Sequence, residues 1–138
     1  MKKNLYYSLW VTFIKNQLRK YGDDERKWKF DLLLLVSHFF GLGLWTILIW
    51  LKYFNVFTFK QVEFPVGGSD YLTGALSFLV QYTLIFITIN YFLIFHRKRY
   101  LKLITRYEPM GKIGGLIFII GFAGGAFLSF AIITLLSD

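Results

Sequence analysis

The chain has 138 residues, of which 56% are hydrophobic, and it carries a formal net charge of +8. It contains no cysteine, which excludes disulfides, thiolate chemistry and cysteine-based zinc or iron–sulfur sites. The apolar residues are concentrated in three long runs, which is the pattern that a lipid bilayer selects.

The first expected element is an amphipathic helix over residues 4–21. One face is aromatic and aliphatic, and the other carries Ser8, Thr12 and Lys15. Such a helix lies in the membrane interface against anionic headgroups, or it packs as a cap on the end of the second span; both arrangements stay open. Charges at Lys15, Arg19 and Lys20 interrupt its apolar stretch and no small-residue cleavage site follows, so we expect it to be retained rather than removed as a signal peptide.

Three apolar runs follow, at residues 32–51, 71–95 and 113–136. A helix needs about 20 apolar residues to cross the hydrocarbon core, and its backbone groups must be paired within the segment. The sequence therefore predicts an all-α membrane protein. We expect a single integral membrane domain over residues 1–138, with three transmembrane helices plus the N-terminal amphipathic interfacial helix. The second helix is expected to continue beyond the bilayer to about residue 107, until Pro109 and Gly111 stop it.

The loop between the first two spans, residues 52–70, is rich in aromatic and β-branched residues and ends in a PVGGSD turn. A lone hairpin is marginally stable in water. We therefore expect this outer loop to lie on the headgroup surface or to pair with another chain.

The distribution of basic residues predicts the orientation. Fourteen of the sixteen Lys and Arg residues lie in residues 1–31 and 96–112. By the positive-inside rule the N-terminus is cytoplasmic and the C-terminus lies outside, and the expected location is a bacterial cytoplasmic (inner) membrane. No motif of a nucleic-acid-binding module accompanies the basic cluster, so nucleic acid is not expected as a partner. Six basic residues are expected to contact anionic lipid headgroups: Lys15, Arg19, Lys20, Arg97, Lys98 and Arg99.

His38 is the only ionisable side chain well inside a predicted span, where polar groups are costly and often functional. Asn90, on the antiparallel second span, is expected at the same depth, so the sequence predicts a hydrogen bond between His38 and Asn90 that joins the two helices. A proton or ligand role for His38, with Asp31 on the same face, is the alternative. A metal site is not expected, because His96 is the only other histidine. Gln81 is expected to join helices, with pore lining as the alternative.

Small residues recur at every fourth position of the third run, at Gly121, Gly125 and Ser129, which allows close backbone approach. Ser37 and Gly41 have the same spacing on the first run, at a similar depth. We therefore predict that the first and third helices cross near Gly41 and Gly125 within the chain.

The sequence shows no catalytic motif, and no acidic residue lies inside a predicted span. This favours a non-catalytic subunit or accessory (assembly) factor of a larger membrane complex, with no cofactor. One alternative is a homo-oligomeric pore, either holin-like or a membrane-disrupting effector; another is a small transporter or membrane enzyme that uses His38. The expected partners are membrane lipids, together with other membrane protein subunits or further copies of the chain.

Overall fold

The computed structural model describes residues 2–58, 63 and 69–137, and these residues form helices with no strand among them. Three helical segments are long and apolar enough to cross a membrane: α2 (Lys29–Tyr53), the segment that begins with α3 at Asp70, and α6 (Gly111–Ser137). The coarse prediction is therefore confirmed: the described residues are almost entirely helical, and three helices are long and apolar enough to span a membrane.

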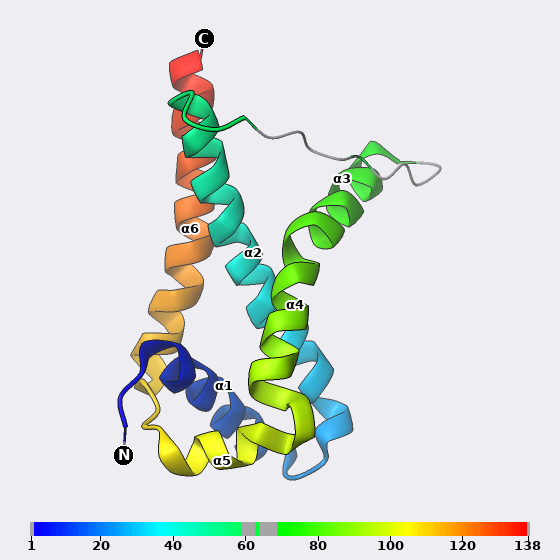
Figure 1. Ribbon diagram of the computed structural model, residues 1–138, viewed down its shortest axis with the longest axis vertical. Coiled ribbons are helices and arrows are strands. Elements are labelled where there is room, and N and C mark those ends of the chain that lie inside the picture. The colour runs from blue at the N-terminus through cyan, green and yellow to red at the C-terminus, as the bar shows by residue number, and fades with distance from the viewer. Residues whose placement is uncertain (1, 59–62, 64–68, 138) are drawn as a thin grey trace.

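The helices are arranged as a splayed set above a transverse base (Figure 1). In this view α2 and α6 rise side by side, whereas α3 (Asp70–Phe78) leans away from them. Helices α1 (Leu5–Tyr21) and α5 (Arg99–Arg106) lie across the lower end. We call this end, which also contains the 3-10 turns η1 (Glu25–Lys27) and η4 (His96–Lys98), the basic end, because most of the chain's Lys and Arg residues belong to it.

Local sequence explains where α1 begins and ends. Asn4 caps its start, because its side-chain oxygen accepts a hydrogen bond of 3.2 Å from the backbone N–H of Tyr7. Gly22 ends it with a φ of 64°, a conformation that costs glycine little.

The second span is not a regular helix. It runs through α3, the π-helical turn η2 (Leu79–Thr83), α4 (Leu84–Asn90) and a second π-helical turn, η3 (Tyr91–Phe95). It then breaks at Arg97 and Lys98, which adopt left-handed φ angles of 52° and 56°. The predicted helical extension to about residue 107 does reach Arg106, but it is not continuous: the kink separates α5, which turns across the base.

The most fully buried large side chains lie at the basic end, where aromatic residues from separate segments meet. Trp10 of α1 packs edge-on against Phe95 at 5.6 Å between ring centroids, and Trp28 packs edge-on against Tyr100 at 5.7 Å. Such edge-to-face pairs stabilise beyond simple area burial. Helix α1 therefore packs as a cap on the other helices of this end. This is the second of the two arrangements expected for residues 4–21.

The polar face assigned to α1 is partly wrong, because Ser8 and Thr12 are buried. Thr12 Oγ1 accepts a hydrogen bond of 2.7 Å from the backbone N–H of Met110 and donates one of 2.8 Å to the Ser8 carbonyl. The N-terminus is also tied to the end of α5, since the Lys2 N–H donates to the Arg106 carbonyl at 3.0 Å. These bonds hold α1 against the segment that leads into α6.

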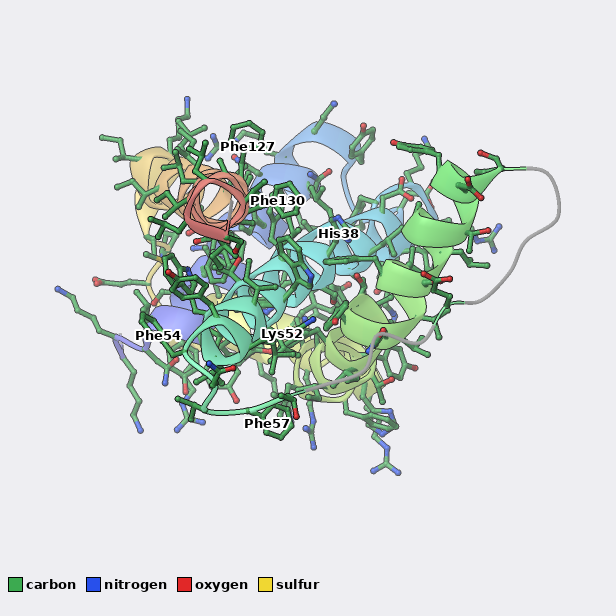
Figure 2. All side chains as sticks on the ribbon, turned by 90° about the horizontal axis from the view of Figure 1, so that it is seen from above. His38, Lys52, Phe54, Phe57, Phe127 and Phe130 are labelled. Atoms are coloured by element: carbon green, nitrogen blue, oxygen red, sulfur yellow. The ribbon has the colours of Figure 1, made fainter. Side chains whose placement is uncertain are left out.

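Helix α6 is the most exposed of the three spans, and only Gly115, Ala126 and Ser129 are buried on it. Figure 2, a view from above, shows Phe130 beside α2, where its ring stacks with Trp45 at 6.2 Å between centroids. The prediction for the outer loop concerns mainly residues 59–62 and 64–68, which lie outside the described residues.

Candidate functional site

A buried chain of polar side chains joins three helices near the basic end. The Tyr6 hydroxyl donates to Asn90 Oδ1 at 2.6 Å, and Asn90 Nδ2 donates to Ser37 Oγ at 2.8 Å. Asn90 and Ser37 are buried, so each bond satisfies a group that water does not reach. Burial raises the pKa of Tyr6 to about 12, because the charged phenolate is disfavoured away from water. This network positions α1 on α2 and α4.

The predicted hydrogen bond between His38 and Asn90 is wrong. His38 Nδ1 instead shares a hydrogen bond of 3.1 Å with Thr83 Oγ1, and the Phe78 ring packs edge-on against the imidazole at 5.4 Å. Successive side chains on a helix point about 100° apart. Because α2 directs Ser37 toward Asn90, His38 faces a different part of the second span.

Gly41 allows close approach to the same threonine. A Cβ at Gly41 would lie 3.2 Å from Thr83 Oγ1 and 3.3 Å from the Thr83 backbone nitrogen. Thr83 ends the π-helical turn η2, and such turns occur frequently at functional sites. His38 and Gly41 therefore form one contact surface on α2 for the second span.

The predicted crossing of α2 and α6 near Gly41 and Gly125 is wrong as well. A Cβ at Gly121 or Gly125 would meet no atom within 4 Å. The contact between these helices uses Gly43 instead, where a Cβ would lie 2.2 Å from the Phe122 ring. Further along, Trp50 Nε1 donates to Ser129 Oγ at 2.9 Å, so Ser129 does join the two helices, through its hydroxyl.

Two further polar candidates lie on α2 and on the second span. Gln81 is half-buried within η2, and Asp31 is exposed in the first turn of α2. Among the residues that the structure describes, no three His, Asp or Glu side chains gather as a possible metal site.

The six basic residues expected at lipid headgroups all lie on α1, η4 or the start of α5. Lys15 is half-buried and the others are exposed. Arg99 donates to the Phe92 carbonyl at 3.1 Å across the break in the second span. Lys98 lies 3.9 Å from the Glu25 carboxylate.

Glu25 lies at the centre of an ionic cluster with Tyr100, Lys29 and Lys98, which was not among the sites predicted from the sequence. Its carboxylate accepts a short hydrogen bond from the Tyr100 hydroxyl and pairs with Lys29 at 3.3 Å. The Tyr100 hydroxyl is the main cause that holds the pKa of Glu25 below its usual value. The i,i+4 spacing of Glu25 and Lys29 was the available signal in the sequence, but the contact to Tyr100 depends on how α5 turns back.

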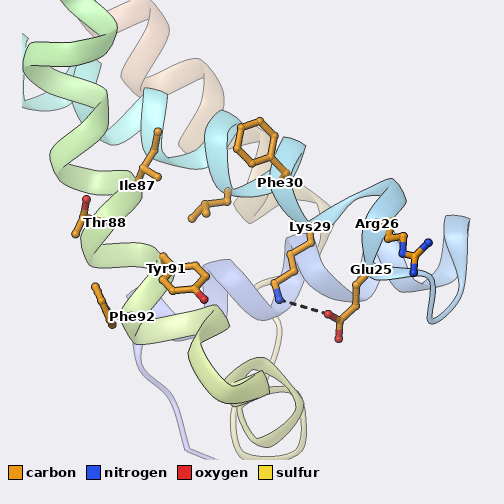
Figure 3. Close-up of a pocket in the computed structure, with 9 residues that line it drawn as sticks. Glu25, Arg26, Lys29, Phe30, Ile87, Thr88, Tyr91 and Phe92 are labelled. Atoms are coloured by element: carbon orange, nitrogen blue, oxygen red, sulfur yellow. Dashed lines mark hydrogen bonds and ion pairs between the residues drawn. The ribbon is translucent and has the colours of Figure 1, made fainter.

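The Glu25 cluster borders a groove of about 640 Å³ between the start of α2 and the second span (Figure 3). Arg26 and Lys29 lie at one side of this groove, and Tyr91 and Phe92 lie on the facing helix. No local sequence pattern indicates this groove, because its two walls are 54 or more residues apart in the chain.

Comparison of the chain with family models, curated proteins and solved structures found no match. The functional argument therefore depends on the geometry of the helices.

Proposed function

We propose that the chain is a non-catalytic subunit or accessory factor of a larger membrane assembly. The observation that carries this proposal is the open glycine face of α6, where Gly121, Gly124 and Gly125 have no atom within 4 Å of a Cβ position. Small residues permit another helix to approach closely, and in lipid such packing is a main source of helix association. A partner's helix seated there would bury part of the most exposed span.

The proposed setting is a bacterial cytoplasmic membrane, with the N-terminus and the basic end cytoplasmic and the C-terminus outside. The partition of the basic residues supports this orientation. In this setting the exposed basic residues of α1, η4 and α5 contact anionic headgroups, and α1 lies in the interface while it caps the spans.

Extraction in a mild detergent, followed by identification of co-purifying chains, tests the proposal. Gly121→Leu adds bulk to the open face and should release the partner without lowering the melting temperature of the isolated chain. Ala123→Leu, on the opposite side of α6, is the matched control and should retain the partner. A closed homo-oligomer without a foreign chain would instead support the pore alternative.

A second candidate is a small transporter or membrane enzyme that uses His38. The observation in its favour is the pairing of His38 with Thr83 at a π-helical turn. His38→Gln separates the two candidates: a subunit should keep its partner and its stability, whereas a transported-proton or catalytic role requires loss of activity at unchanged stability.

A further inference from the structure

We infer that the groove beside Glu25 binds one anionic phospholipid, whose phosphate is held by Arg26 and Lys29 and whose acyl chain lies along the apolar walls. The assignment is independent of the partner proposed for α6. The groove measures about 640 Å³, which falls in the range of about 300–1,000 Å³ typical of small-molecule sites.

The charge at the mouth of the groove favours an anion. The Glu25 carboxylate is already engaged by Tyr100, Lys29 and Lys98. Arg26 makes no ion pair or hydrogen bond with any residue that the structure describes, and its exposed side chain lies at the rim of the groove, beside Glu25 (Figure 3). Arg26 and Lys29 together carry one more charge than the Glu25 carboxylate neutralises, so the groove mouth is positively charged. A guanidinium can form two parallel hydrogen bonds with a phosphate.

The walls below this mouth favour a hydrocarbon chain over a water-soluble phosphate. Phe30 and Leu33 of α2 and Ile87 and Phe92 of the second span line the groove, and Figure 3 shows Ile87 on the side of its helix toward α2. Phe30 and Phe92 are exposed, so a ligand that covers them removes apolar surface from contact with water or with loosely packed lipid. The groove thus presents a charged end and an apolar end, as a phospholipid does.

A protein helix is a poorer occupant. The walls present the bulky rings of Phe30, Tyr91 and Phe92 rather than small residues, which prevents close backbone approach. An apolar helix would also cover Arg26 without neutralising it, which is costly for a charged group.

Titration of the purified full-length chain in neutral detergent, followed by native mass spectrometry, tests the inference. Phosphatidylglycerol should bind with one saturable site, and phosphatidylcholine with the same acyl chains should bind more weakly. Glycerol 3-phosphate, the headgroup without chains, should not bind. Arg26→Gln should weaken phosphatidylglycerol binding about fivefold, the factor expected for one basic residue at an anionic headgroup.

Lys112→Gln is the matched control, because it removes one positive charge from an exposed position at the start of α6 that does not line the groove, and it should leave the affinity unchanged. Thr88→Trp, at an exposed position that lines the groove, should abolish saturable binding by filling it. Equal weakening by Arg26→Gln and Lys112→Gln, equal binding of the two lipids, tight binding of glycerol 3-phosphate, or full binding by Thr88→Trp would each overturn the assignment. So would a photo-reactive label on Thr88→Cys that attaches to a polypeptide rather than to lipid.

Discussion

The two glycines that were predicted to meet, Gly41 and Gly125, should respond oppositely to alanine. At Gly41 the new Cβ would lie 3.2–3.3 Å from the side chain and backbone of Thr83, and helical hydrogen bonds hold that backbone in place. Such overpacking costs about 1–3 kcal/mol. Disturbing the hydrogen bond between His38 and Thr83 adds about 0.6 kcal/mol to this destabilisation. The lower backbone entropy of alanine in the unfolded chain offsets about 0.5–1 kcal/mol of the total.

The expected net loss for Gly41→Ala is therefore about 0.6–3 kcal/mol of unfolding free energy. Gly125→Ala places its Cβ in open space and should be stabilising by about 0.5–1 kcal/mol. Titration with a denaturing detergent, followed by circular dichroism in micelles of the isolated chain, measures both values. If Gly125→Ala destabilises the isolated chain as much as Gly41→Ala does, the stripe on α6 is a packed internal contact and the assignment of the open face fails.

Three further outcomes are expected. Asn90→Leu removes one buried and one part-buried hydrogen bond and should lower the unfolding free energy by about 1–3 kcal/mol; an unchanged detergent titration would refute a stabilising network. An impermeant thiol reagent applied to intact cells should label Ser69→Cys and not Lys102→Cys, and the reverse pattern would invert the proposed orientation. The carboxyl of Glu25 takes up a proton at higher pH in the unfolded chain than in the folded one, so the folded state should lose stability as the pH falls through the lowered pKa. Tyr100→Phe should reduce this acid-induced loss of stability, measured as the change in melting temperature between about pH 5 and pH 3.

The number and type of spanning helices followed from the sequence because each span satisfies its own backbone hydrogen bonds. A run of about 20 apolar residues is sufficient to specify a membrane helix whatever its neighbours are. The same locality explains the cap of α1 at Asn4. Which face of helix α1 is buried depends on its tertiary contacts as well as on the local sequence pattern. Ser8 and Thr12 illustrate this, because they are polar and yet buried.

The tertiary structure determines which polar side chains form hydrogen bonds with each other. His38 and Asn90 were matched by depth alone, but a hydrogen bond also requires that both side chains point toward each other around their helix axes. The π-helical turn η2 changes the directions in which the side chains of the second span point around the helix axis. No periodicity in the sequence predicts this turn. Thr83 therefore meets both His38 and Gly41, while Asn90 meets Ser37.

The groove at the basic end depends on the tertiary structure in the same way. The left-handed conformations of Arg97 and Lys98 reverse the chain so that Tyr100 reaches Glu25. Of the two cations that line the groove, Lys29 pairs with Glu25 and Arg26 has no ion pair with a described residue. Charge composition predicted that this end contacts anions. Which cation is available to bind one, and beside which apolar wall, is fixed only when segments distant in the chain have packed together.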